Sequence, residues 1–67
     1  MAVASVSKIT AASPESFDDA VREGLIRASK TLRGITGLHV LEQKASVADG
    51  KIGEYRVTME VTFILEN

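Results

Sequence analysis

The sequence predicts an α+β fold of order β-α-β-β, in which a three-stranded antiparallel sheet wraps around one helix. Three observations predict this class: a period of two over residues 52–65, a helix-type apolar stripe after Pro14, and an Asp49-Gly50 turn between two strand patterns. The two periodicities distinguish strand from helix, and an Asp-Gly turn joins neighbouring antiparallel strands. We expect residues 1–67 to form a single domain.

The last strand pattern, residues 52–65, sorts its side chains onto two faces. One face is apolar and consists of Tyr55, Val57, Met59, Val61, Phe63 and Leu65. The other face consists of Glu54, Arg56, Thr58, Glu60, Thr62 and Ile64. Such alternation is typical of an antiparallel strand that packs one face on a core. The second face combines charges, hydroxyls and β-branched residues, so we expect it to contact another molecule.

The helix is expected to follow a first strand over residues 3–10, whose alternation is poor. Ser13 is the expected N-cap and Pro14 the first helical residue, because the N–H that Pro lacks would have no partner there. The apolar stripe has the spacing of one helical face and contains Phe17, Ala20, Val21, Gly24, Ala28 and Leu32. Gly34 is the expected stop after Arg33, since glycine commonly follows a helix C-terminus.

The second strand, residues 38–47, is expected to form a long hairpin with the third through the turn of residues 48–51. Asp and Gly tolerate the positive φ angles that tight hairpin turns require. Strands of ten or more residues are long for so small a domain. We therefore expect the sheet to curl around the helix and to leave its convex face uncovered.

The small size of the chain predicts self-association. Ordering costs roughly 1.5 kcal/mol per residue, so about 100 kcal/mol must be offset by apolar burial. Small domains often rely on disulfides, metals or subunit contacts. With no cysteine, disulfides and thiolate metal sites are excluded, and contact between copies of the chain remains. We expect a homo-oligomer.

Composition argues against several classes of protein. The net charge is −1 and the charges are spread evenly, whereas a nucleic-acid-binding protein normally shows a basic stripe. No stretch approaches the roughly 18 apolar residues of a membrane span, and the N-terminus does not resemble a secretory signal. Nucleophile triads and glycine-rich phosphate loops are also missing. We expect a soluble, cytoplasmic protein that is not an enzyme.

The polar face of the last strand contains the candidate binding residues. Arg56 can grip an anionic or planar ligand, because a guanidinium group binds oxyanions and stacks on rings. The alternative is a set of cross-strand ion pairs at a subunit interface. Carboxylates collected from several copies, with Glu42 and Glu60 as candidates, can bind Ca²⁺ or Mg²⁺. The lone His39 is interpreted as a strand residue at a surface or interface.

Several stretches of the chain resemble the dodecins, a family of small flavin-binding proteins. The residues that carry the resemblance are Ser13 to Phe17, the helical Ala20 and Ala28, residues 40–43, and above all residues 55–63, Tyr-Arg-Val-Thr-Met-Glu-Val-Thr-Phe. The resemblance runs roughly from Val3 to Leu65. It implies the β-α-β-β fold and twelve subunits in a hollow shell of cubic symmetry.

The resemblance also implies a site, from which this chain departs. In flavin-binding dodecins, pairs of isoalloxazine rings lie at two-fold interfaces between a tryptophan of the second strand and a glutamine of the third. Here Gly37 stands in place of the tryptophan and Arg56 in place of the glutamine. The predicted ligand-facing residues are thus Arg56, Gly37, which cannot stack, and Gln43 on the second strand.

The predicted function is accordingly that of a dodecin-like ligand-binding or storage protein in which binding of a flavin (riboflavin, FMN or FAD) is weak or absent. An arginine at this place resembles a dodecin branch described as calcium-binding. The alternative hypothesis is therefore a calcium-binding or purely structural shell, in which ion pairs of Arg56 close the former flavin site.

Overall fold

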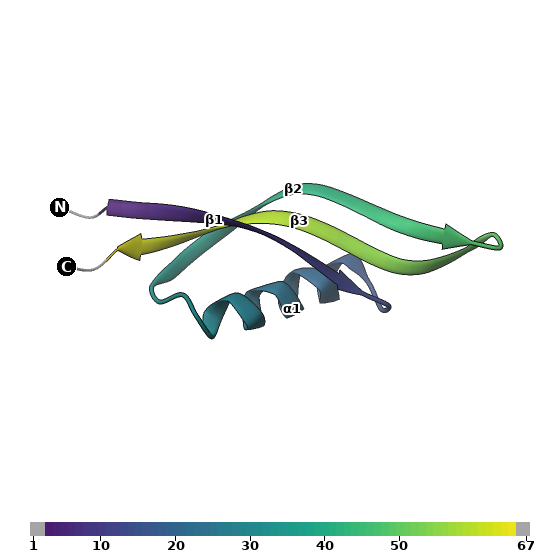
Figure 1. Cartoon of the computed structure of the whole chain (residues 1–67), viewed down its shortest axis with the longest axis horizontal. Helices are drawn as coiled ribbons and strands as arrows, with labels where there is room; N and C mark the ends of the chain where they lie inside the picture. The colour runs from purple at the N-terminus through teal and green to yellow at the C-terminus, as the bar shows by residue number, and fades with distance from the viewer. Residues whose placement is uncertain (1–2, 66–67) are drawn as a thin grey trace.

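The computed structural model describes residues 3–65 as four elements, β1 (Val3–Ser13), α1 (Phe17–Ser29), β2 (Ile35–Ala48) and β3 (Lys51–Leu65). The strands form one antiparallel sheet in the order β1-β3-β2, so the last strand of the chain is central. Figure 1 shows α1 on one side of the sheet, where it packs against β1 and β3. The predicted β-α-β-β fold with an antiparallel sheet and one helix is confirmed.

The core lies between α1 and the centre of β3. Val57, Met59 and Val61 have no exposed surface, and neither has Ala20 of the helix. These three alternate residues of β3 belong to the apolar face expected from the sequence, which confirms that this face packs on the core. A ring of partly buried residues surrounds them and contains Ile9, Ala11, Phe17, Val21, Leu32, Ile35, Leu38 and Val40.

The helix begins three residues later than the sequence predicted. Ser16 is the N-cap, and its Oγ accepts a hydrogen bond from the backbone N–H of Asp19 at 2.9 Å. Ser13, the expected cap, is the last residue of β1 and is only 2% exposed. The prediction was wrong because two serines at this turn can each bond an orphan N–H.

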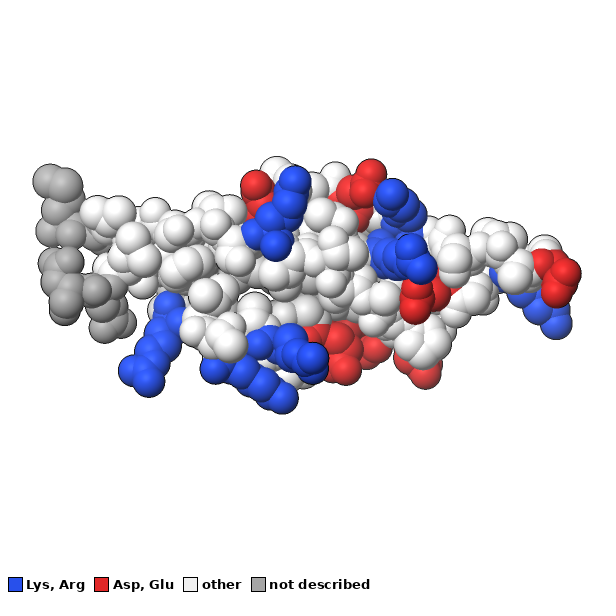
Figure 2. Space-filling view, in the orientation of Figure 1, with Lys and Arg blue, Asp and Glu red and all other residues white. Residues whose placement is uncertain are grey.

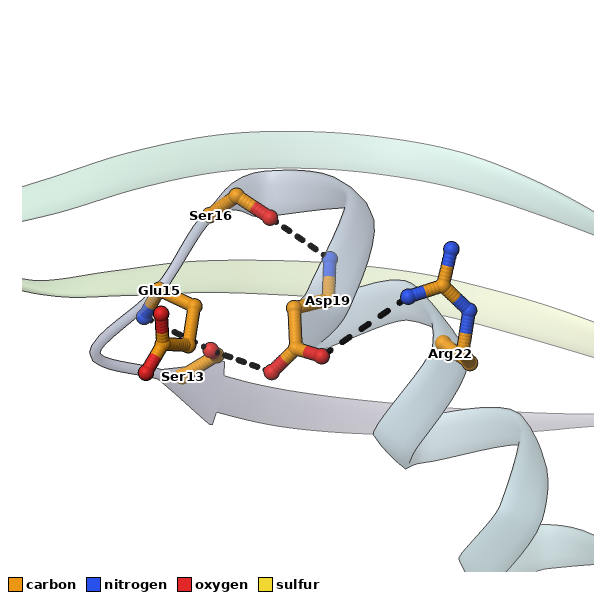
Figure 3. A network of polar contacts seen from close by, with 5 residues as sticks. All are labelled: Ser13, Glu15, Ser16, Asp19 and Arg22. Atoms are coloured by element: carbon orange, nitrogen blue, oxygen red, sulfur yellow. Dashed lines mark hydrogen bonds and ion pairs between the residues drawn. The ribbon is translucent and has the colours of Figure 1, made fainter.

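Ser13 instead holds the turn between β1 and α1 (Figure 3). Its Oγ accepts a hydrogen bond from the backbone N–H of Glu15 at 2.9 Å and donates one to Oδ2 of Asp19 at 2.6 Å. The other carboxylate oxygen of Asp19 lies 3.8 Å from the guanidinium of Arg22. This network fixes the first turn of α1 to the end of β1.

The other element boundaries also differ from the predictions. α1 ends at Ser29, earlier than the expected Arg33, and the chain tightens there, since the backbone N–H groups of Lys30 and Thr31 bond the carbonyls three residues back at 3.2 and 3.1 Å. Gly34 does adopt a positive φ of 71°, as expected of a residue after a helix, but it begins the approach to β2. β1 is longer than the expected strand of residues 3–10, and β2 is longer than the expected strand of residues 38–47.

Within residues 3–65, no helix is long and apolar enough to cross a membrane.

Candidate functional site on the outer face of the sheet

The side of the sheet opposite α1 carries the polar residues of β3. We call it the outer face. Because directly opposed residues in an antiparallel sheet point the same way, the register assigns the partners of these residues to this face. Three rows cross the sheet from β1 through β3 to β2: Lys8–Glu60–His39, Thr10–Thr58–Glu42 and Ala12–Arg56–Lys44. The outer face is thus a ladder of charges and hydroxyls.

Arg56 occupies the middle of its row, with the small Ala12 on one side and Lys44 on the other. Its Nε donates a hydrogen bond to Oε1 of Glu54 at 2.7 Å, which orients the guanidinium. Among residues 3–65, the two terminal nitrogens of Arg56 have no hydrogen-bond partner, and its side chain is 56% exposed. Lys44 lies 3.6 Å from a carboxylate oxygen of Glu42. The guanidinium is therefore oriented at one edge and free at the other.

A bulge in β2 decides which residues join Arg56. The register shifts between Val40 and Glu42, so His39 and Glu42 both lie on the outer face, opposite Glu60 and Thr58. Gln43 pairs with the buried Val57, which places it on the helix side of the sheet. The structure therefore does not bring Gln43 together with Arg56, although the sequence analysis grouped them. An inserted residue of this kind leaves no clear signal in the alternation.

Gly37 lies on the outer face opposite Thr62, at an open position. A Cβ atom added there would have no other heavy atom within 4 Å. Arg56 is six residues away along β3, or about 20 Å at 3.3 Å per residue. Within one chain, a small ligand that contacts Arg56 does not reach Gly37.

The two candidate metal ligands, Glu42 and Glu60, are diagonal neighbours on the outer face. Residues in this relation have Cα atoms about 7–8 Å apart. Glu60 also lies 3.9 Å from Nδ1 of His39. Among residues 3–65, no group of three or more His, Cys, Asp or Glu is close enough to hold a metal ion. One copy of the chain therefore supplies two carboxylates and not a complete cation site.

Two residues of β1 belong to the outer face but were not identified from the sequence. Lys8 lies opposite Glu60, and the hydroxyl of Thr10 forms a hydrogen bond of 3.1 Å with that of Thr58. The irregular alternation of β1 concealed the register, although Lys8 and Thr10 do stand two residues apart. Figure 2 shows acidic and basic side chains next to one another over the sheet.

Comparison with known proteins agrees with this fold. Residues 3–66 match the model of the Dodecin family. A curated dodecin from Thermus thermophilus is 34% identical over 59 residues, which cover 88% of this chain and 86% of that protein.

Solved structures give the same result. The dodecin from Streptomyces davaonensis superimposes with a TM-score of 0.94 at 38% identity, covering 98% of this chain and 97% of the other. A calcium dodecin from Mycobacterium tuberculosis, described as a calcium-chelating antigen with a novel calcium-binding site, gives a TM-score of 0.82 at 35% identity, with 96% and 91% covered. With a family model that spans nearly the whole sequence, and relatives more than 30% identical, the chain belongs to the dodecin family.

Proposed function

We propose that the protein is a non-catalytic, small-ligand-binding dodecin that assembles into a homododecamer and binds its ligand on the outer face. The observation that carries the proposal is the guanidinium of Arg56, which Glu54 orients and which is otherwise free on an exposed face. A guanidinium in this state offers a planar fork to an oxyanion and a flat surface to an aromatic ring.

The site is completed by a second copy of the chain. Arg56 lies three residues before Met59 on β3, and Gly37 is level with Thr62, three residues after it. A second copy laid antiparallel across the outer face, about a two-fold axis at the level of Met59, places its own Gly37 over Arg56. The two positions that are about 20 Å apart in one chain then line one pocket.

The ligand of this pocket is a planar or anionic small molecule, and flavin binding is weak or absent. Gly37 provides no ring to stack on, and aromatic pairs contribute about 0.5–1.5 kcal/mol beyond the area they bury. Arg56 donates hydrogen bonds but accepts none, so it cannot serve the donor groups of a flavin ring.

A tryptophan introduced at position 37 tests the proposal. We expect Gly37→Trp to quench riboflavin fluorescence at micromolar concentration, and the parent protein to do so weakly or not at all, because the position is open. Ser29→Trp, at an exposed position of α1 on the other side of the sheet, is the control. If Gly37→Trp quenches no more than Ser29→Trp, the pocket is not vacant, and a shell closed by ion pairs of Arg56 replaces this proposal.

A calcium site is the second candidate function, and the same two-fold arrangement favours it. Glu42 is level with Thr58, and Glu60 lies two residues further along β3, so both flank the level of Met59. Two copies related by an axis there bring four carboxylates together. Hard cations such as Ca²⁺ prefer six to eight oxygen ligands, which carboxylates and water can supply.

Thermal unfolding with and without calcium tests the calcium site. A ligand at 100 times its Kd stabilises the folded state by about 2.7 kcal/mol, so calcium should raise the Tm relative to protein in a chelator. Glu60→Gln is nearly isosteric and should remove the increase, whereas Glu23→Gln on the helix should keep it. Identical melting curves in calcium and in chelator would exclude the calcium site.

A further inference from the structure

A groove runs between α1 and β1, along the free edge of the sheet. Its volume is about 800 Å³, which lies within the roughly 300–1,000 Å³ of small-molecule sites. The residues assigned to the outer-face site, namely Arg56, Gly37, Glu42 and Glu60, do not line this groove. It is therefore a separate surface, and the proposed function leaves it unused.

The floor of the groove is narrow and largely aliphatic. Most of its lining side chains are small or aliphatic, namely Ile9, Ala11, Ala12, Gly24, Ile26 and Ala28. A Cβ atom added at Gly24 would lie 3.1 Å from that of Ala11, so the helix passes close to the strand. Ile26 is 50% exposed, and no aromatic side chain is among the described residues that line the groove. This floor suits a thin aliphatic chain better than a planar ring.

The end of the groove near the C-terminus of α1 is basic. Arg27 and Lys30 line it, and both are exposed. Neither has an ion-pair partner within residues 3–65. The carbonyls of Arg27 and Ala28 already accept bonds from the N–H groups of Lys30 and Leu32, so they do not require these side chains. Figure 2 shows basic atoms grouped over this half of α1. Two cationic groups are thus available to an anion.

The opposite end of the groove is acidic. Glu23 lines it one helical turn before Arg27, and it too has no ion-pair partner among residues 3–65. The helical side of the groove runs from Glu23 to Thr31, about 12 Å at 1.5 Å per residue. A ligand with a negative group at each end would meet repulsion at Glu23. The charges therefore favour a ligand with one anionic end.

We propose that the α1–β1 groove binds an amphipathic monoanion, an unbranched aliphatic chain that ends in one carboxylate. The carboxylate lies between Arg27 and Lys30, and the chain extends over the small residues of the floor towards Glu23. Ile26 loses its exposure to water when the chain covers it. The site shares no residue with the proposed outer-face site, so neither depends on the other.

A fluorescent fatty acid, dansyl-labelled undecanoic acid, tests the site on the assembled protein. We expect its emission to rise when the chain enters the groove, and octanoate, decanoate and dodecanoate to displace it. Affinity should increase up to about fourfold for each added methylene until the groove is filled. Decanol lacks the charge and decanedioate carries a second carboxylate, so both should displace the probe less well than decanoate.

Substitutions at the basic end test the place of the carboxylate. Arg27→Gln and Lys30→Gln should each weaken decanoate binding roughly two- to fivefold, as expected for contacts between exposed charges. Arg33→Gln changes the net charge equally at an exposed position outside the groove, and should keep the parent affinity. Circular dichroism checks that the three variants keep the fold.

Three results would overturn the proposal. If the assembled parent protein does not bind the probe, a second copy or another strand on the edge of β1 occupies the groove. If Arg56→Gln abolishes binding while Arg27→Gln and Lys30→Gln bind as the parent does, the probe lies on the outer face. Equal displacement by decanol and decanoate would show that the basic end selects nothing. The Gly37→Trp and calcium experiments concern other residues, so either proposal can fail while the other stands.

Discussion

At the scale of single residues, Gly24 sets the distance between helix and sheet. A Cβ atom there would overlap Cε of Met59 and would lie 3.1 Å from the Cβ of Ala11. Met59 has no exposed surface, so its Cε would have to move within the packed core. The absent side chain lets α1 sit close enough to bury Met59 completely.

Gly24→Ala is therefore expected to destabilise the protein, although alanine favours helices by about 1 kcal/mol over glycine. Overpacking a core costs about 1–3 kcal/mol, so we expect a net loss near 1 kcal/mol in the free energy of unfolding by urea. In a Met59→Val background the shorter side chain leaves room, and the same substitution should then be neutral or stabilising. An equal loss in both backgrounds would show that Met59 is not the obstacle.

Single residues also show how far the sequence predicts the site. The alternation of β3 placed Arg56 and Glu60 on the face opposite Val57, and the structure confirms that face. Gln43 was grouped with Arg56 although the sequence leaves open which residues of the second strand face the polar side of the third. The bulge at Leu41 reverses that assignment. One inserted residue is a local backbone event with little side-chain signature, and packing against β3 decides it.

At the scale of elements, the turn from β1 into α1 depends on two serines with different roles. Ser16 caps the helix, and the buried Ser13 links the backbone of Glu15 to the carboxylate of Asp19. The capping rule correctly predicted a helix start here, but it assigned the N-cap to Ser13 instead of Ser16. Both serines satisfy the capping rule, and only the tertiary position of β1 buries one of them.

Ser13→Ala should cost more stability than Ser16→Ala. Removing an N-cap typically costs about 1 kcal/mol. Removing the hydroxyl of Ser13 leaves a part-buried N–H and a part-buried carboxylate oxygen without their partner, and a loss of this kind costs up to about 3 kcal/mol. Urea unfolding of both variants measures the difference, and Ser29→Ala on the exposed side of α1 is the control. A larger loss for Ser16→Ala would show that the Ser13 network contributes little.

At the scale of the whole molecule, one copy leaves much of its apolar surface uncovered. The fully or nearly buried apolar residues are Ala20, Ala28, Val57, Met59 and Val61, and two of these five are alanines. Large apolar side chains are exposed on all three strands and on the helix, namely Val3, Val6, Ile26, Leu41, Val47, Ile52 and Leu65. The described residues extend over 52 × 19 × 13 Å, an elongated shape with a large surface for its volume. We expect such a chain to gain stability from contact with other copies.

The Tm should consequently rise with protein concentration, because association couples to folding by mass action. Circular dichroism melts over a hundredfold range of concentration measure the rise, and sedimentation at the lowest concentration shows whether dissociation accompanies unfolding. Ile52→Lys replaces an exposed apolar residue of β3 with a charge and should lower the Tm most at low concentration. Glu15→Gln, at an exposed position in the turn before α1, should follow the parent curve. A folded monomer whose Tm is independent of concentration would contradict both the assembly and the idea that neighbouring copies supply the missing core.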